Sequence, residues 1–445
     1  MTSDATPSAC PAHDRTPMYG AEFAEDPGRV YDALRRSGPV APVELAPGVP
    51  ATLVLGYQTA LDVLHDPATF PKNPARWEST VPADCPVLPM MMARPNCLFT
   101  DGDVHARLRQ AVTDSLDQID VSALRGYVER NADLLIDRFA PVGKADLLTQ
   151  YASVLPLMVF NELFGCPPDI GDRLVSGMRG IFDGIDAEKA NAELIRGVAD
   201  LIAHKREQPG ADVTSRLLNH PAGLTDEELM HQLILLQGAG TEPEQNLIAN
   251  GLRLLLSDDR FGGDLSGGSL PVDDALDEIL WTDPPMANYG ITYPTRDVDL
   301  EGVRLPADQP VVISFAAANT DPAQAAASRT GNRAHLAWSS GPHACPAKSH
   351  ARLIASVALE RLLDRVPDME LAVPADQLTW RPGPFHRALT SLPVEFPPVL
   401  LPTPRDETPD ARQHTPRTAT PPRTPSPIQT RRRWWHSLAK WWRGE

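Results

Sequence analysis

The 445-residue chain lacks several features that would place it in common protein classes. It has no run of about 18 uninterrupted apolar residues, so no membrane-spanning helix is predicted. Its first residues are polar and show no basic start followed by an apolar run, which argues against a secretory signal. The five cysteines, at 10, 85, 97, 166 and 345, have no paired spacing. We therefore expect neither a disulfide framework nor a Cys-x-x-Cys zinc site, and a cytoplasmic location.

Positive charge is also scarce. The formal net charge is −17 at pH 7, which disfavours nucleic acid as a partner. Residues 401–445 nevertheless contain nine Arg or Lys against four Asp or Glu, so this tail carries +5 and the rest of the chain −22. An acidic body with a basic tail indicates two surfaces with separate tasks.

The chain does have enough apolar residues, 42% of its length, to bury a large core. From Val104 to Leu256 the apolar spacing is mostly three and four, the helical period. The longest predicted helix begins at a capping box, Thr225-Asp-Glu-Glu228. Another helix is predicted over Ser349 to Arg365, and short strands are predicted around 43–54, 297–305 and 310–315. The predicted fold is mainly α with a minor β part, a single large domain at 21–400 after a disordered segment at 1–20.

The segment Trp338-Ser-Ser-Gly-Pro-His-Ala-Cys-Pro-Ala347 places a cysteine directly before a predicted helix. The unsatisfied N–H groups at a helix start favour a thiolate at Cys345. A thiolate is a suitable axial ligand for haem iron, because its electron density assists O–O cleavage. Gly341 would let the backbone approach a porphyrin closely, and His343 could reach a haem propionate. The alternative for a lone cysteine is a buried structural thiol.

This segment resembles the cysteine loop of the cytochrome P450 family, Phe-Gly-x-Gly-x-His/Arg-x-Cys-x-Gly. Gly341, His343 and Cys345 match, whereas Trp338 and the residues at the outer glycine positions, Ser339 and Ala347, differ. The resemblance covers roughly residues 20 to 397, with further motifs in the family's order. It implies the family's large helical domain around haem b, with Cys345 as the ligand of the iron.

Two further motifs support the resemblance. His105 and Arg109 share one face of a predicted helix, and the resemblance implies that they bind the haem propionates; a solvated basic face is the alternative. The stretch Ala239-Gly-Thr-Glu-Pro243 is similar to the family's oxygen-activating Ala-Gly-x-Asp/Glu-Thr. By that similarity Ala239 and Gly240 would lie at the cofactor, and Glu242 would deliver protons. The alternative for Glu242 is a solvated charge.

Pro243 stands where the family has an alcohol side chain. Proline removes a backbone donor and crowds the carbonyl of Ala239, so a kink is predicted. Thr241 could supply a hydroxyl instead, although it lies about 200° around the helix from Pro243.

The segment Asp277-Glu-Ile-Leu-Trp281 lies where the family has Glu-x-x-Arg, with Trp281 in place of the arginine. Glu278 thus loses its habitual partners, and if it is buried and unpaired its pKa would rise. The indole N–H of Trp281, or the charge of Arg329 or Arg333, could compensate. Thr292 stands where a propionate-binding arginine is expected. The chain resembles a minority of actinomycete members that lack the Glu-x-x-Arg arginine.

The tail ends in Arg431-Arg-Arg-Trp-Trp-His-Ser-Leu-Ala-Lys-Trp-Trp-Arg443, which holds four of the eight tryptophans. Its apolar residues form one stripe of a helix at 431–445, joined to the body by a disordered Pro/Thr/Arg linker at 401–430. Such a helix can lie on an anionic membrane surface or contact a partner protein. The alternative is that it docks on the acidic body of its own chain.

Three functions fit these features. The first is a haem-thiolate monooxygenase that inserts one oxygen atom from O2 into a small apolar substrate. It would use Glu242 and Thr241 in catalysis and take electrons from a ferredoxin and its reductase, since the sequence contains no flavin or iron–sulfur motif. The second is a haem-binding signalling or scaffold protein with little turnover. The third is a peroxide-using variant, for which the missing alcohol matters less.

Overall fold

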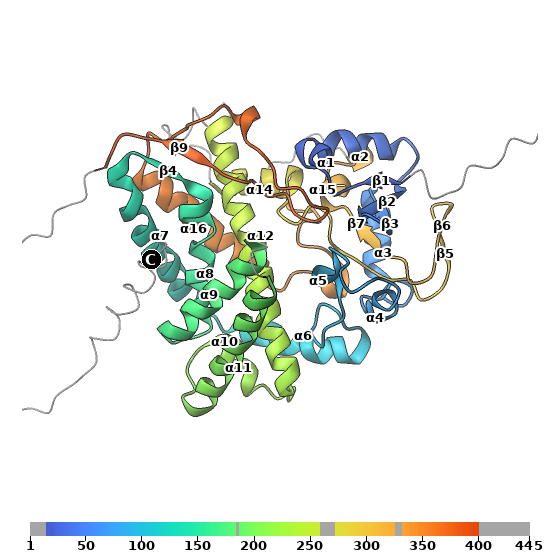
Figure 1. Cartoon of the computed structure of the whole chain (residues 1–445), viewed down its shortest axis with the longest axis horizontal. Coiled ribbons are helices and arrows are strands. Elements are labelled where there is room, and N and C mark those ends of the chain that lie inside the picture. Colours follow the sequence, from blue (N-terminus) through green and yellow to red (C-terminus); the bar gives the residue numbers. More distant parts are fainter. Residues whose placement is uncertain (1–14, 184–186, 259–271, 325–331, 400–445) are drawn as a thin grey trace, which may run out of the picture.

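The computed structural model describes residues 15–183, 187–258, 272–324 and 332–399. Most of the long helices lie on one side of the molecule, and the largest sheet lies on the other with α1 to α3 (Figure 1). Several expectations concern residues outside these ranges: Cys10, Arg329, the linker at 401–430 and the helix at 431–445.

The mainly helical prediction is confirmed. The helices are α1 (Ala21–Glu25), α2 (Pro27–Arg35), α3 (Tyr57–His65), α4 (Ala75–Glu78), α5 (Leu88–Met91), α6 (Gly102–Asp117), α7 (Val121–Phe139), α8 (Leu155–Leu163), α9 (Pro168–Asp183), α10 (Ala187–Glu207), α11 (Val213–Leu218), α12 (Asp226–Ser257), α14 (Val272–Thr282), α15 (Phe315–Asn319) and α16 (Lys348–Arg365). Single helical turns occur at Ala140–Val142, Leu148–Ala152, Pro322–Gln324, Gly341–His343 and Ala375–Gln377.

The predicted strands are also present, in three small sheets. The largest has the order β1-β2-β3-β7, formed by Thr16–Pro17, Val40–Ala46, Val49–Val54 and Val311–Ile313. The second has the order β4-β9-β8, formed by Lys144–Asp146, Pro393–Glu395 and Glu370–Leu371. The third is a hairpin of β5 (Val298–Leu300) and β6 (Val303–Leu305).

The expected boundary of the folded part at residue 20 is wrong. Thr16–Pro17 pairs in parallel with Val43 and Glu44 of β2, and Met18 is fully buried. The burial of this side chain and the strand pairing both stabilise the segment, so folded structure begins before Ala21. Composition alone did not reveal this, because a two-residue strand has no periodicity.

Helix α12 runs through the helical part of the molecule (Figure 1). Its predicted start is confirmed, since Thr225 and Glu228 make both hydrogen bonds of the capping box. The helix packs against α8, α10, α14 and α16, and it continues without interruption through Pro243. It therefore carries Thr241 and Glu242 into the interior.

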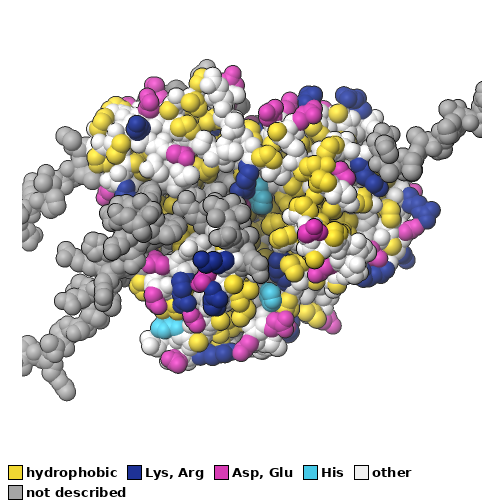
Figure 2. Space-filling model, viewed as in Figure 1, with side chains coloured by type: hydrophobic (Ala, Val, Ile, Leu, Met, Phe, Trp, Pro, Cys, Tyr) yellow, Lys and Arg dark blue, Asp and Glu magenta, His cyan; other side chains and the backbone are white. Residues whose placement is uncertain are grey.

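Buried apolar side chains form one large cluster among the helices and two smaller clusters around the four-stranded sheet. Hydrophobic side chains also gather on the visible face of the sheet-containing part (Figure 2). Among the described helices, none combines the length and apolar character that crossing a bilayer requires.

Candidate haem site

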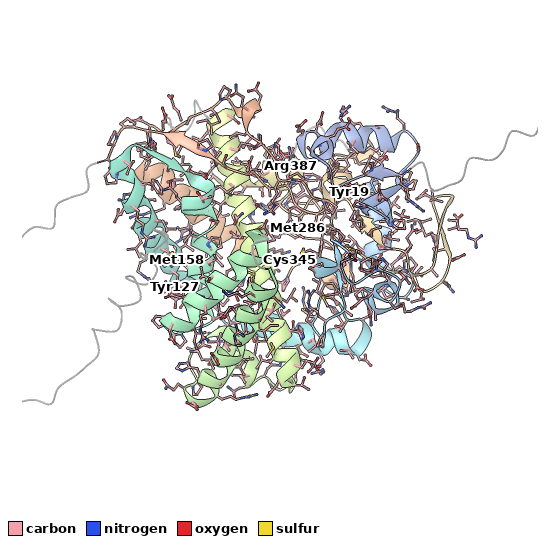
Figure 3. All side chains as sticks on the ribbon, viewed as in Figure 1. Tyr19, Tyr127, Met158, Met286, Cys345 and Arg387 are labelled. Atoms are coloured by element: carbon pink, nitrogen blue, oxygen red, sulfur yellow. The ribbon has the colours of Figure 1, made fainter. Side chains whose placement is uncertain are left out.

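Cys345 lies on a tight loop between the sheet-containing and helical parts, near the middle of the view in Figure 3. The backbone N–H of Cys345 donates to the Trp338 carbonyl at 2.8 Å, and that of Ser339 donates to the Leu336 carbonyl at 2.7 Å. The helix predicted to follow the cysteine is α16, which begins at Lys348. The loop thus holds the cysteine close to a helix start, as the sequence indicated.

The loop requires glycine at 341 for a reason that the sequence did not reveal. Gly341 has φ of +70°, a left-handed conformation that favours glycine. A side chain there would collide with the Leu64 carbonyl oxygen at the end of α3. The close approach at this glycine is therefore to α3, and an approach to a porphyrin stays a prediction.

The environment of the Cys345 thiol has opposing effects on its pKa. Burial raises the pKa, whereas a hydrogen bond from the Ala347 backbone and the charges of Arg109 and Lys348 lower it; burial has the larger effect. The expected help from the helix start is therefore present but insufficient on its own. Coordination to a metal cation would supply the remaining drive to ionise the thiol.

His105 and His343 lie face to face beside this loop. Their ring centroids are 3.9 Å apart with an interplanar angle of 30°, and His105 is only 7% exposed. Nε2 of His105 and Nδ1 of His343 are buried without a hydrogen-bond partner among the described residues. Burial lowers the pKa of both imidazoles, that of His343 to about 2.

Two cations lie close to the histidine pair. Arg109 of α6 donates to the Ala344 carbonyl of the cysteine loop. Lys72 is buried, its Nζ donates to the Ile291 carbonyl at 3.0 Å, and burial lowers its pKa to about 8. Sequence reasoning missed Lys72, because a lone lysine in a loop belongs to no motif and only the fold brings it here.

This set of groups suits the carboxylates of a haem. Within the described part of the chain, one nitrogen of each histidine ring lacks a partner, and the guanidinium and ammonium groups each retain unused donors. Neighbouring cations depress the pKa of His343 further, so an anion at this position would relieve their mutual repulsion. The thiol, the imidazoles and the cations together fit an iron porphyrin with acidic side chains.

On α12 the Thr241 hydroxyl is already engaged. It is buried and donates to the Gln237 carbonyl four residues back, at 2.7 Å. Ala239 is exposed, while the ring of Phe160 lies so close to Gly240 that no side chain would fit there. Whether Ala239 and Gly240 contact a cofactor stays a prediction.

Glu242 is the most unusual group of the stretch. It is 2% exposed, so the interpretation as a solvated charge is wrong. One carboxylate oxygen accepts from Arg381 and, at 3.3 Å, from Asn246. The other oxygen, Oε2, is buried without a hydrogen-bond partner among the described residues. Sequence reasoning missed Arg381, which lies 139 residues further along the chain.

The condition under which the pKa of Glu278 was expected to rise, burial without a partner, is not met. Glu278 is half-buried and not without a partner. Arg333 pairs instead with Asp277, at 2.9 Å from Nε to Oδ2, and Arg352 of α16 donates to the other oxygen of the same carboxylate. The Trp281 indole donates to the Asn332 carbonyl at 2.7 Å. Helix geometry explains this outcome, because consecutive residues on α14 point about 100° apart.

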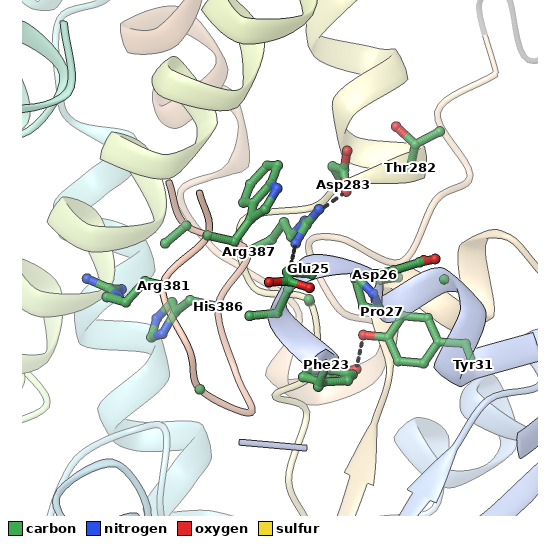
Figure 4. A pocket seen from close by; sticks show the side chains of 18 of the residues that line it. Phe23, Glu25, Asp26, Pro27, Tyr31, Thr282, Asp283, Arg381, His386 and Arg387 are labelled. Carbon is green, nitrogen blue, oxygen red and sulfur yellow. Dashed lines mark hydrogen bonds and ion pairs between the residues drawn. The ribbon is translucent and has the colours of Figure 1, made fainter. Parts of the chain in front are cut away.

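A pocket of about 270 Å³ lies between α1, α14 and the loop around residues 380–388. Arg381 and His386 stand on the side nearer α12, whereas Arg387 lies beside Asp283 on the other side (Figure 4). Arg387 pairs with Asp283 at 3.2 Å, and its guanidinium carbon lies 3.3 Å from the ring centroid of Trp380. The lining includes none of Cys345, His105 or Glu242, but Arg381 lines the pocket and also donates to Glu242.

Comparisons with known proteins give one consistent result. No family model matches the chain. The chain is 34% identical to the cytochrome P450 monooxygenase PikC of Streptomyces venezuelae, over 85% of this chain and 92% of that protein. It is 30% identical to a vitamin D(3) 25-hydroxylase of Pseudonocardia autotrophica, over 86% of this chain and 96% of that protein.

Solved structures agree with these relatives. The structure of CYP154C4 from a Streptomyces species matches with a TM-score of 0.77 at 30% identity, covering 85% of this chain and 97% of that one. CYP154A1 from Streptomyces coelicolor matches with a TM-score of 0.74 at 29% identity, covering 86% and 100%. Since the similarity spans nearly the whole of each relative, the chain belongs to the cytochrome P450 family of haem-thiolate monooxygenases, which carry haem b.

Proposed function

We propose that Cys345 is the axial ligand of haem b and that the enzyme inserts one oxygen atom from O2 into a small, largely apolar substrate. The observation that carries the proposal is the meeting of the Cys345 loop with a buried His105–His343 pair, in which one nitrogen of each ring lacks a hydrogen-bond partner among the described residues. Bound haem supplies the redox chemistry, taking electrons from a donor and activating O2. The residues described below hold the cofactor and move protons.

His105, His343, Arg109 and Lys72 bind the two propionates in this proposal. The imidazoles would donate hydrogen bonds, and the two cations would neutralise the carboxylates. Buried cations are costly without anions, so the propionates would stabilise this part of the fold as well as hold the haem. Ala239, Gly240 and Gly341 are proposed to line the space near the porphyrin.

Glu242 is the proposed proton carrier. Arg381 and Asn246 hold one of its oxygens, which leaves Oε2 to accept and release a proton. Thr241 is the other proposed catalytic residue; its hydroxyl donates to the Gln237 carbonyl, so it would take part in the relay as a hydrogen-bond acceptor. Water at the position of the missing alcohol is the proposed substitute beside Pro243.

The test of the axial ligand is the difference spectrum of the reduced protein with carbon monoxide. Wild-type protein should show the absorption band of a thiolate-ligated haem. Cys345→Ser should abolish that band, whereas Cys97→Ser should keep it, because Cys97 carries no proposed ligand role. A thiolate band that survives in Cys345→Ser would refute the proposal.

Electron supply is the second part of the proposal. We propose a ferredoxin and its reductase as donors in the cytoplasm, with NAD(P)H as the source of electrons. Relatives named as monooxygenases and hydroxylases favour this function over a scaffold or a peroxide-using variant. Incubation with ferredoxin, reductase and NAD(P)H should consume substrate, and activity with peroxide alone would argue for the peroxide-using variant instead.

The tail at 431–445 is the third part. We propose that it contacts an anionic membrane surface or a partner at the inner face of the membrane, on the strength of its tryptophan stripe and basic residues. Deletion of 401–445 should abolish binding to anionic vesicles while leaving haem content unchanged. A tail-deleted protein that still sediments with those vesicles would contradict this part.

A further inference from the structure

Asp277 provides a buried anionic junction between three parts of the chain. It is 5% exposed, and its two oxygens accept from Arg333 and Arg352. Arg352 also donates to Asp273, one turn earlier on α14, at 3.1 Å. We infer that Asp277, Arg333 and Arg352 are positioning residues that hold the cysteine loop where its sulfur can bind iron, an inference that rests on the proposed function.

The two arginines lie on opposite sides of the cysteine in the sequence. Arg333 lies 12 residues before Cys345, and Arg352 lies seven residues after it, in the second turn of α16. Both connect to one carboxylate on α14. The loop is thus tied at its entry and at its exit to the same point of a rigid helix.

A second set of contacts holds the entry segment in place. The Trp281 indole donates to the Asn332 carbonyl at 2.7 Å, and its ring meets His335 edge-on with centroids 5.7 Å apart. Trp281 lies one turn after Asp277 on α14, so both side chains contact the entry segment at Asn332 and Arg333. The tryptophan thereby fixes the backbone from which Arg333 reaches Asp277.

The contacts continue from this segment to the cysteine. Asn319 accepts from the Leu336 N–H at 2.6 Å and donates to the Leu280 carbonyl of α14 at 2.9 Å. Leu336 in turn accepts from Ser339, and the Trp338 carbonyl accepts from Cys345. Hydrogen bonds therefore lead from α14 through the entry segment to the backbone of Cys345.

Asp277 suits this task because its charge is both buried and shared. Removing a buried carboxylate leaves two arginines without their common acceptor, which is costly for the local structure. Groups that orient a metal ligand typically change metal affinity or activity by about 10- to 100-fold when they are altered. The arrangement accounts for a cysteine loop held firmly although the position of Trp281 carries no arginine.

The experiment compares Asp277→Asn with a control variant, Asp133→Asn, in the full-length chain. Asp133 of α7 also accepts from two arginines of α16, Arg361 and Arg365. These two arginines lie near the C-terminal end of α16, away from the cysteine loop. Each variant would be assayed for the thiolate-ligated fraction of the reduced carbon monoxide complex and for the rate of haem transfer to apomyoglobin. The urea midpoint of unfolding would be measured in parallel.

Asp277→Asn should lower the thiolate-ligated fraction and speed haem transfer by about 10- to 100-fold. Asp133→Asn should lower the urea midpoint but keep the thiolate fraction of wild type. If both variants lower the midpoint and neither changes the thiolate fraction, Asp277 is merely structural and the inference is overturned.

If Asp277→Asn does not fold, variants of Arg333 provide the test instead. Its side chain is 57% exposed, so Arg333→Met should fold. That variant should lose part of the thiolate fraction, and Arg333→Lys should restore some of it by keeping the charge. Equal thiolate fractions in wild type, Arg333→Met and Arg333→Lys would overturn the inference. A wild-type protein without any thiolate band would refute the proposed function itself, and this inference with it.

Discussion

Ser339 adopts a backbone conformation that suits glycine. Its φ is +60°, in a region where side chains are strained by about 1 to 2 kcal/mol. Glycine removes that strain but gains entropy in the unfolded chain, an opposing effect of about 0.4 to 1 kcal/mol. We predict that Ser339→Gly raises the free energy of unfolding by about 1 kcal/mol, measured by urea unfolding.

The neighbouring serine provides the control. Ser340 has an extended backbone with φ of −146° and a hydrogen bond to His65 at 2.7 Å. Ser340→Gly should therefore destabilise the protein. A Ser339→Gly variant that is less stable than wild type would show that the loop is not strained at this residue.

A second prediction at the residue scale concerns Glu242. Glu242→Gln retains the shape of the side chain but cannot carry a proton as a carboxylate does. We predict that NAD(P)H consumption per haem, with ferredoxin and reductase, falls by about 100-fold while the haem content stays the same.

Glu244, two residues along α12, is the matched control. It is buried, and burial raises its pKa well above the ordinary value. Glu244→Gln keeps the shape of this neighbouring buried side chain, which has no proposed role in proton transfer, and should change turnover little. Equal losses in the two variants would mean that Glu242 acts through the packing of α12.

At the scale of elements, Pro243 lies inside α12, where it supplies no backbone N–H, yet the helix does not end there. Proline inside a helix costs about 3 kcal/mol relative to alanine. We predict that Pro243→Ala raises the free energy of unfolding by about 1 to 3 kcal/mol, measured by urea unfolding of the haem-loaded protein. Gln245→Ala, a change within the same turn, should shift it by no more than a few tenths. A destabilised Pro243→Ala would show that neighbouring side chains depend on the proline.

The same helix shows which features of the fold follow from local sequence. The capping box fixed its first residue, and the apolar period fixed its length, because both act between residues three or four apart. Helix α16 was found for the same reason, and the strands β2 and β3 were found from short apolar runs, which are also local in the sequence. The two-residue strand at Thr16–Pro17 was missed, since it depends on pairing with β2 rather than on its own residues.

At the scale of the whole molecule, buried histidines link stability to pH. Burial lowers the pKa of His335 and of His386 to about 4. Their pKa values in the folded protein lie below those in the unfolded chain, so the unfolded chain binds protons first as pH falls. The stability that these two histidines contribute is therefore fully present above about pH 6.5, and it is lost as the pH falls from there toward 4.

His335 offers the cleaner test, because it lies away from the proposed propionate site and is 6% exposed. Its contribution amounts to about 3 kcal/mol over this range. We predict that His335→Gln flattens the dependence of unfolding free energy on pH between 6.5 and 4. An unchanged slope would assign the loss of stability to other groups.

The residues of the candidate site, like the elements, were predicted where the signal is local in the sequence and missed where it is not. Cys345, His105, Arg109 and His343 were predicted from motifs, and the fold brings the two histidines into contact. Motifs did not predict the roles of Lys72, Arg381 and Asp277, because the partners of these residues lie far away in the sequence. Arg381 meets Glu242 across 139 residues, and Arg333 meets Asp277 across 56.

The sequence by itself determined the helical class, the start of α12 and the helix after Cys345, since each depends on hydrogen bonds or spacing within a few residues. The role of the cysteine loop was predicted from a resemblance to the family. Only the tertiary structure decided which carboxylate on α14 is buried and which arginines donate to it. The tertiary structure also explains why position 341 requires glycine. Those outcomes depend on which distant segments exclude water from one another, and burial of that kind leaves no periodic trace in the chain.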